Sequence, residues 1–185
     1  VTIPARKLFD IVRALPDGSK ISLSHTGDKV TIQAGKSRYT LATLPAKDFP
    51  ENDQLAIVER IKVPEAALKE LIERTAFAMA QQDVRYYLNG LLFDLKGKTL
   101  RCVSTDGHRL ALCETELHES VENRKQIIMP RKGVLELQRL LEDGDGEIVL
   151  EVGNNHLRVS RSDVTFSTKL IEGKFPDYEA VIPIG

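Results

Sequence analysis

Apolar positions along the chain fall three times into the spacing i, i+3, i+4, i+7, which marks the buried face of a helix. The positions are Leu8, Ile11, Val12 and Leu15 in the first copy, Leu68, Leu71, Ile72 and Thr75 in the second, and Val134, Leu137, Gln138 and Leu141 in the third. The pattern predicts three helices that bury equivalent stripes.

Segments that alternate between apolar and polar residues follow each helix, as is typical of strands. The first copy reads KISLSH, KVTIQA and RYTLATL, and the third reads EIVLEV, HLRVS and VTFSTKL, with the turn signals TGD and GNN between strands. A looser second copy continues through LLFDLKGKTLRCVSTDGHRLALCE. The chain therefore repeats one module, a helix followed by strands, with a period of about sixty residues.

The copies also share residues at their beginnings and ends. Each helix begins at a proline, Pro4, Pro64 or Pro130, which suits the first helical turn because an N–H there has no intrahelical partner. Two copies close on Phe-Pro followed by an acid, at Phe49–Pro50 and Phe175–Pro176. We expect this ending to be structural in both copies.

One helix over a small sheet cannot bury enough surface alone, so we expect the modules to pair, with sheet edges joined and helices on one face. The predicted fold class is α+β, with antiparallel sheets and helices on their inner face. Modules at about 61–120 and 126–183 complete a domain over 56–185. Residues 1–55 are expected to be the C-terminal half of a preceding domain whose first half is not in this chain.

Composition fits a folded protein, since 29% of the 185 residues are charged and 42% are apolar. No apolar run is long enough to cross a bilayer and no secretory pattern opens the chain, so we expect a cytoplasmic protein. Cys102 and Cys113 fall in neighbouring predicted strands and are expected to be free thiols. The chain starts without methionine inside the strand-like VTI, which indicates a piece of something longer.

Few chemical motifs are present. A phosphate-binding glycine loop, a metal-spaced His/Cys cluster and a dinucleotide fingerprint are all missing, so we expect no cofactor, no metal and no nucleotide-driven motor. The stretch STDGHR leaves one alternative open, a small hydrolase in which Asp106 and His108 activate Ser104 or Thr105. The dipeptide Asp-Gly is also a common turn signal, which favours a non-catalytic role.

Four motifs in order, QQDVRYYLNG, STDGHRLAL, MPRKGVLEL and GKFPDYEAVIP, resemble those of the bacterial DNA polymerase III beta-subunit family, the sliding clamps. The resemblance runs the full chain and corresponds to the second half of the first clamp domain and the whole second domain. It implies a non-catalytic processivity subunit, a ring-shaped homodimer of three-domain subunits whose helices line a central hole.

Sliding on DNA needs diffuse positive charge near phosphates and no tight contact to bases. Net charge is −1, yet residues 1–50 hold eight Lys and Arg against four acids, and the remainder holds eighteen against twenty-three. The polar helix faces read Arg6, Asp10, Arg13 in the first copy, Lys132, Glu136, Arg139 in the third, but Ala66, Glu70, Glu73 in the second. A merely solvated helix face explains such charges equally well.

The resemblance implies two sites. The DNA-facing residues are Arg6, Gln82, Tyr86, Tyr87, Arg131 and Lys132. Three of these lie in QQDVRYYLNG, an inserted loop, where strand alternation alone predicts one tyrosine ring inside and one outside. The second site is one wall of a groove for short partner peptides, formed by Arg85, Leu88, Thr105, Gly107, His108, Arg109, Leu110, Pro176 and Val181.

The groove suits a peptide because apolar walls can bury its side chains while a few polar groups orient its backbone. Its other wall belongs to a third domain, so we expect this chain alone to bind peptides poorly. The implied partners are double-stranded DNA, polymerase III subunits, the clamp loader and other proteins with a clamp-binding motif, with no membrane partner. The implied location is the bacterial cytoplasm, at the nucleoid.

Overall fold

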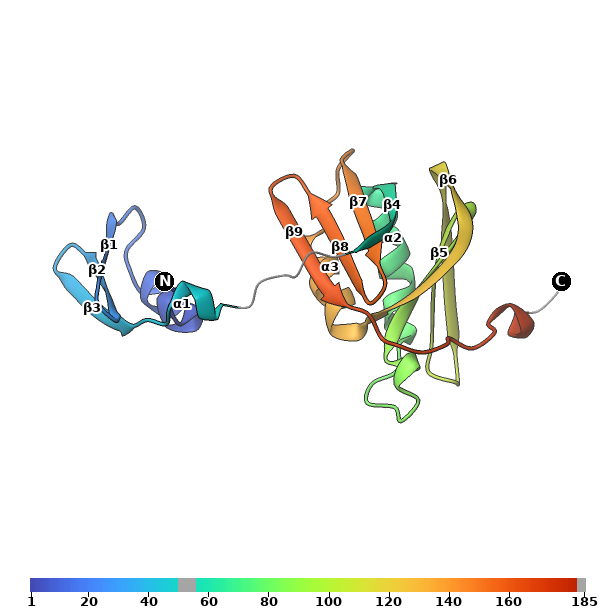
Figure 1. Cartoon of the computed structure of the whole chain (residues 1–185), viewed down its shortest axis with the longest axis horizontal. Helices are drawn as coiled ribbons and strands as arrows, with labels where there is room; N and C mark the ends of the chain where they lie inside the picture. Colours follow the sequence, from blue (N-terminus) through green and yellow to red (C-terminus); the bar gives the residue numbers. More distant parts are fainter. Residues whose placement is uncertain (50–55, 183–185) are drawn as a thin grey trace. The chain divides into compact units, whose positions relative to one another are not determined.

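A computed structural model describes residues 1–49 and 56–182 of the chain. The chain divides into two compact units, Val1–Gln54 and Leu55–Gly185, referred to below as unit 1 and unit 2 (Figure 1). Pro50, the predicted domain boundary at residue 55 and the predicted module end at residue 183 lie outside the described residues.

Unit 1 is one module, a helix followed by an antiparallel meander. Its elements are α1 (Ala5–Arg13), β1 (Ile21–Thr26), β2 (Lys29–Ala34), β3 (Ser37–Ala42) and the 3-10 helix η1 (Ala46–Asp48), with the strand order β1-β2-β3. The central strand alternates as predicted, because Val30, Ile32 and Ala34 are buried and the residues between them are not. The sequence pattern therefore located these elements within about two residues.

The expectation that α1 buries its stripe is wrong for this chain. No residue of α1 is fully buried, Val12 is 43% exposed, and Phe9 beside the stripe is 61% exposed. Leu23 of β1 is exposed as well, at 59%. The physical reason is the small size of the unit, since one helix and three strands supply too few neighbours to cover both their faces.

Unit 2 contains two modules. Its elements are β4 (Ile57–Pro64), α2 (Glu65–Thr75), η2 (Ala76–Ala78), η3 (Tyr86–Leu88), β5 (Gly90–Thr105), β6 (Leu110–Pro130), α3 (Arg131–Leu140), β7 (Glu147–Gly153), β8 (His156–Arg161), β9 (Val164–Lys169) and η4 (Glu179–Val181). The strands form one sheet in the order β4-β7-β8-β9 and a second from β5 and β6, all antiparallel.

The two modules of unit 2 complete each other by exchanging strands. β4 precedes α2 in the chain but pairs with β7, which follows α3. The end of β6 precedes α3 but pairs with the start of β5, which follows α2. β6 also runs without interruption through residues 120–126, where the sequence placed the boundary between modules. Neither module can therefore be removed without opening the sheet of the other.

A glycine divides the long strand β5. Gly97 has a φ of 57°, in the left-handed region that favours glycine, and the register to β6 shifts on both sides of it. Residues 90–95 pair with 125–130, and residues 99–105 pair with 110–116. These two segments are the counterparts of the first two strands in the other modules, which explains why the second copy is harder to see in the sequence.

The atomic detail supports the repeat. Pro4, Pro64 and Pro130 all immediately precede a helix, with φ of −63°, −56° and −62°. They occupy the N-cap position, one residue earlier than predicted. An isolated bridge joins Thr2 to Leu44 in unit 1, and its counterpart joins Ile128 to Ile171 in unit 2.

A large apolar cluster joins the helices and strands of unit 2. Leu68, Leu71 and Ile72 of α2 meet Val134 and Leu137 of α3 in this cluster, which includes buried residues from every described strand of the unit except β9. Phe166 of β9 is partly buried and packs against it. The stripes predicted for the second and third helices are thus buried, except for Gln138, which is half-buried. The predicted α+β fold, with helices packed on antiparallel sheets, is confirmed.

Two further observations concern the strands and helices. Cys102 and Cys113 lie directly opposite each other in β5 and β6, both as free thiols, and burial raises the pKa of the Cys102 thiol well above its ordinary value.

Among the described residues, every helix is too short or too polar to span a lipid bilayer.

Candidate functional site

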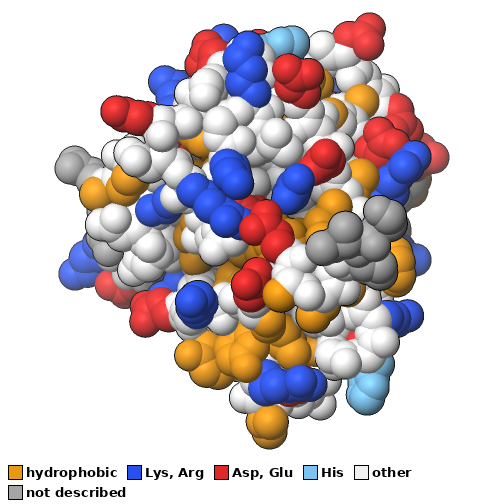
Figure 2. Space-filling view, turned by 90° about the vertical axis from the view of Figure 1, so that its right-hand side faces the viewer, with side chains coloured by type: hydrophobic (Ala, Val, Ile, Leu, Met, Phe, Trp, Pro, Cys, Tyr) orange, Lys and Arg blue, Asp and Glu red, His pale blue; other side chains and the backbone are white. Residues whose placement is uncertain are grey.

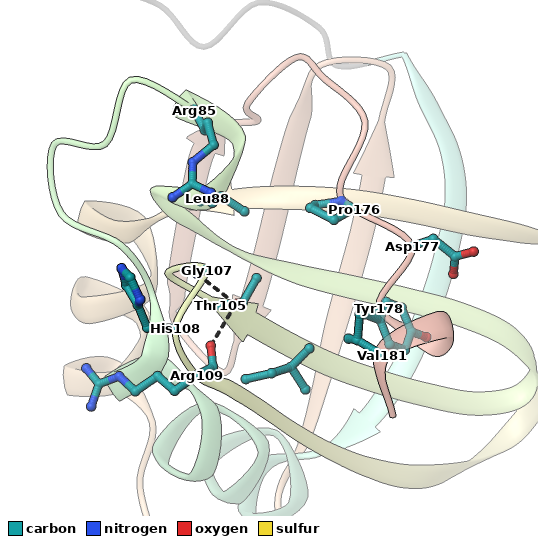
Figure 3. Close-up of a pocket in the computed structure, with 11 residues that line it drawn as sticks. Arg85, Leu88, Thr105, Gly107, His108, Arg109, Pro176, Asp177, Tyr178 and Val181 are labelled. Atoms are coloured by element: carbon teal, nitrogen blue, oxygen red, sulfur yellow. Dashed lines mark hydrogen bonds between the residues drawn. The ribbon is translucent and has the colours of Figure 1, made fainter. Parts of the chain in front are cut away.

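Three segments far apart in the sequence meet around one hollow of about 420 Å³ in unit 2. They are the inserted loop after α2, the turn between β5 and β6, and the segment after β9 (Figure 3). The lining residues are Arg85, Leu88, Thr105, Gly107, His108, Arg109, Leu110, Pro176, Asp177, Tyr178 and Val181. The structure therefore brings together all nine residues predicted for the groove wall and adds Asp177 and Tyr178.

The turn between β5 and β6 is fixed by its own side chains. The Asp106 carboxylate accepts the backbone N–H groups of His108 at 3.0 Å and Arg109 at 3.1 Å. These bonds hold the pKa of Asp106 below its ordinary value, because they favour the charged form. The Thr105 hydroxyl donates to the Arg109 carbonyl at 2.7 Å and accepts the Gly107 N–H at 3.0 Å. The turn thus presents its residues to the hollow in a fixed arrangement.

Arg85 of the inserted loop is held against this turn. Its guanidinium donates two hydrogen bonds to the Asp83 carboxylate, at 3.0 and 2.8 Å, and one to the Asp106 carbonyl at 3.3 Å. The paired guanidinium lowers the pKa of Asp83 to about 2. The Asn89 amide bonds both backbone groups of Asp83, at 2.9 and 2.8 Å, so the inserted loop closes on itself.

Arg109 links the turn to the end of α2. It donates to the Asp106 carboxylate at 3.2 Å and to the Phe77 carbonyl at 2.9 Å. Its guanidinium also lies 5.6 Å from the centre of the Phe77 ring, a cation–π contact. Both arginines at the hollow are therefore oriented by carboxylates, which leaves their charges largely neutralised.

The floor of the hollow is apolar and rigid. Leu88 and Tyr178 are each 2% exposed and belong to a buried cluster that includes Leu92, Val103 and Phe175. Val181 on the rim is 67% exposed. Figure 2 shows apolar side chains gathered on this side of the molecule below a group of basic and acidic ones. The hollow thus combines a fixed apolar floor with an open rim, which suits an apolar side chain from another molecule.

The geometry does not support the hydrolase alternative. Ser104 is fully buried and its hydroxyl donates to the Thr75 carbonyl at 2.5 Å. Asp106 is occupied by the amides of its own turn and by Arg109, so it is not available to orient a catalytic histidine. In residues 1–49 and 56–182, no group of three or more His, Cys, Asp and Glu could hold a metal ion.

Five of the six residues predicted to face DNA lie in unit 2, at the inserted loop and the start of α3. Gln82 is exposed with a φ of 56°, and Lys132 is exposed. Tyr86 is 57% exposed, whereas Tyr87 packs against the apolar cluster, with the rings edge to face at 5.7 Å. The predicted one-in, one-out arrangement is confirmed, although it arises in a 3-10 helix and not in a strand.

The other two residues predicted to face DNA, Arg131 and Arg6, differ in their contacts. Arg131 connects α3 to the inserted loop, because its backbone N–H donates to the Asn89 carbonyl at 3.0 Å and its guanidinium to the Met79 carbonyl at 3.4 Å. Arg6 is exposed on α1 in unit 1. On α3 the Arg139 guanidinium pairs with Glu136 at 3.0 Å, as charges do on an ordinary solvated face.

Sequence reasoning missed the residues that orient the site. Asp83, Asn89 and Phe77 do not line the main hollow, yet they fix the two arginines that do. The spacing of Asp83 and Arg85 in the motif QQDVRYYLNG carried a weak signal, since residues two apart can pair within a turn. No local pattern linked Phe77 to Arg109, which are 32 positions apart.

Comparison with known proteins bears on both units. The family model described as DNA polymerase III beta subunit, central domain, matches residues 62–177, and the model of the N-terminal domain matches residues 1–53. The chain is 49% identical over 185 residues to the beta sliding clamp of Pseudomonas aeruginosa and 47% identical over 182 residues to that of Escherichia coli K12. It spans about half the length of these curated relatives, 50% of each.

Solved structures give the same result. The crystal structure of the DNA polymerase III subunit beta from Pseudomonas aeruginosa matches with a TM-score of 0.93 and 49% identity, covering 99% of this chain and 50% of that one. A second structure, described as a sliding clamp from the same organism bound to griselimycin, matches with the same TM-score, identity and coverage.

Proposed function

Because this chain belongs to the family of bacterial DNA polymerase III beta subunits, the beta sliding clamps, we propose that it forms part of a ring that encircles duplex DNA. In this proposal the chain supplies the second half of the first clamp domain and the whole second domain. The complete protein is a homodimer of three-domain subunits. It catalyses no reaction and acts as a processivity factor, by keeping its partners close to DNA.

The observation that carries the proposal is the hollow between the inserted loop, the β5–β6 turn and the segment after β9. An apolar floor with Leu88 and Tyr178, a rim with Val181 and a polar edge with Thr105 and His108 match the requirements of a short peptide with apolar anchors. We assign the other wall of the groove to the third domain. The bound partners are polymerase III subunits, the clamp loader and other proteins with a clamp-binding motif.

DNA contact in this proposal is electrostatic and independent of sequence. Gln82 and Tyr86 project from the inserted loop, and Lys132 is exposed at the start of α3. Arg6, Tyr87 and Arg131 complete the proposed set. The exposed face of α2 bears Glu70 and Glu73, so the positive charge is local and weak, which suits a ring that must slide. Its place of action in the cell is the cytoplasm, at the bacterial nucleoid.

A charged residue placed in the hollow tests the peptide site. Leu110 is half-buried and lines the hollow, so Leu110→Asp should raise the Kd of a fluorescein-labelled hexapeptide with two large apolar anchor residues at least about tenfold in the full-length clamp. Val164→Asp, at an apolar position on β9 that is 36% exposed, is the control and should leave the Kd unchanged. Failure of the unaltered clamp to bind this peptide, measured by fluorescence anisotropy, contradicts the proposal.

The same assay compares the peptide affinity of this chain with that of the full-length clamp. With one groove wall missing, residues 1–185 alone should bind the hexapeptide much more weakly than the full-length clamp does, because the apolar contacts with the other wall are lost. Equal affinity of the two proteins contradicts the assignment of the second wall to another domain.

A further inference from the structure

One buried carboxylate lies behind the peptide pocket without lining it. Asp94 of β5 is 3% exposed, and its oxygens accept hydrogen bonds from four donor groups on three side chains. Arg124 and Gln126 of β6 donate at 2.9 Å through Nε and Nε2, and Arg124 donates a second time through Nη2. The fourth donor is the Tyr178 hydroxyl, at 2.7 Å.

Tyr178 connects the pocket to the buried carboxylate. Its ring lines the pocket, and its hydroxyl reaches the buried carboxylate of Asp94. Tyr178 is only 2% exposed, so neighbouring residues enclose its side chain. Figure 3 shows Tyr178 between Pro176 and Val181 on the strand-free segment that forms this wall of the pocket.

That segment lacks the support of a sheet. Within residues 172–182, the described backbone hydrogen bonds reduce to one short-range bond, from the Val181 N–H to the Tyr178 carbonyl. The last attachment to a strand is the Ile171 N–H to the Ile128 carbonyl, at 2.9 Å. The segment is therefore held by side chains: Phe175 in the apolar cluster, Tyr178 on Asp94, and Glu179 on Arg101 at 3.2 Å.

We propose that Asp94 is a positioning residue for peptide binding: through the Tyr178 hydroxyl it fixes the pocket wall that carries Pro176 and Val181. A wall fixed before binding loses less conformational entropy when the peptide arrives, which increases affinity. This inference rests on the proposed function of the pocket and concerns Asp94, which does not line the pocket.

The electrostatics favour a persistent anchor. Burial acts to raise the pKa of Asp94, but the hydrogen bonds from Arg124, Tyr178 and Gln126 outweigh it and lower the pKa. The carboxylate is therefore charged at neutral pH. A charged acceptor makes the stronger type of hydrogen bond, and the Arg124 guanidinium compensates the charge of the Asp94 carboxylate. Glu179 faces the same cluster and pairs with Arg101 and Arg124.

The test uses two variants of the full-length clamp and the fluorescein-labelled hexapeptide. Tyr178→Phe keeps the ring and removes the anchor, and Asp94→Asn changes a residue that does not line the pocket. Each should raise the peptide Kd about five- to twentyfold, mainly through faster dissociation. The double variant should bind the peptide no more weakly than the weaker-binding single variant does, because both changes act on the same hydrogen bond.

Glu65→Gln is the matched control. Glu65 is 4% exposed and accepts the Glu142 N–H at 2.7 Å while facing Arg161, so its loss perturbs an equally buried carboxylate elsewhere in unit 2. It should lower Tm as much as Asp94→Asn does, with an unchanged Kd. Amide hydrogen exchange supplies a second readout, since Asp94→Asn and Tyr178→Phe should speed exchange at Val181 but not in β7 and β8.

The outcomes are distinct. If the unaltered clamp does not bind the hexapeptide, the proposed function fails. If it binds and both variants bind equally well, the pocket stands and the positioning role of Asp94 is overturned. The role is also overturned if Glu65→Gln weakens binding as much as Asp94→Asn, because the effect is then one of general stability.

Discussion

Gly107 shows how a single residue can serve both the backbone and the pocket. Its φ of 89° is one that side-chain-bearing residues rarely adopt, and a Cβ there would lie 2.9 Å from Nη1 of Arg85. The residue therefore permits the tight turn and leaves room for the Arg85 side chain, which lies against the turn and also lines the hollow.

Gly107→Ala should therefore reduce both the stability of the fold and the affinity of the pocket for the peptide. We expect a loss of about 1–2 kcal/mol in the free energy of unfolding from the strained backbone, together with a weaker peptide Kd because Arg85 is displaced. Urea denaturation and anisotropy measure the two effects. Gly97→Ala is the control, since Gly97 has a φ of 57° but nothing within 4 Å of the added Cβ. It should cost stability without changing the Kd, and a normal Kd in Gly107→Ala would refute this account.

The lowered pKa of Asp83 predicts how the contact between Asp83 and Arg85 depends on pH. Its pKa is lowered from 3.8 to about 2 by the hydrogen bonds from Arg85. Because the pKa in the folded state is the lower one, the Asp83–Arg85 contact contributes fully above about pH 4 and is lost as the pH falls toward 2. NMR titration of the carboxyl group should show a midpoint near 2 in the native protein, and Arg85→Gln should move it back toward 3.8. A native midpoint near 3.8 contradicts the observed pairing.

Residues that line the pocket were predictable from the sequence, whereas those that orient it were not. Leu88, His108 and Pro176 stand in recognisable motifs. Asp94 has no such motif, and its importance comes from Arg124 and Tyr178, which are 30 and 84 positions away. A buried network of this kind is defined by the fold, so no local pattern indicates it.

At the scale of elements, equal hydrophobic spacing did not mean equal burial. Ile72 of α2 is fully buried, whereas Val12 occupies the same offset in α1 and is 43% exposed. Periodicity tells which face of a helix is apolar, but the neighbours that cover this face come from elsewhere in the chain. The second module was the hardest to recognise, because Gly97 and the length of β6 merge its strands.

Two alanine variants of the 185-residue chain test this difference. Ile72→Ala should lower the free energy of unfolding of unit 2 by about 3 kcal/mol, since it leaves a cavity in the core. Val12→Ala should cost unit 1 less than about 1 kcal/mol, because its side chain already meets water. Native-state hydrogen exchange reports on the two units separately. A cost for Val12→Ala as large as that for Ile72→Ala contradicts the exposure seen in α1.

At the scale of the molecule, the modules depend on one another. β4 precedes the helix of one module but pairs with the sheet of the other, and the end of β6 does the same in the opposite sense. The helices α2 and α3 of unit 2 also share one large apolar cluster, so the two modules form one interdependent structure. The repeat in the sequence predicted that modules would pair, but not that they would exchange strands. That arrangement depends on long-range pairing, which a one-dimensional pattern does not encode.

In the proposed function, the complete protein stays on DNA because its ring encloses the duplex, and not because of tight contacts. Loaded onto a nicked circular plasmid, the full-length clamp should stay bound through gel filtration in moderate salt. After a restriction enzyme linearises the plasmid, the clamp should slide off the free ends and elute alone. Equal retention on circular and linear DNA, or rapid loss from both, would contradict the account.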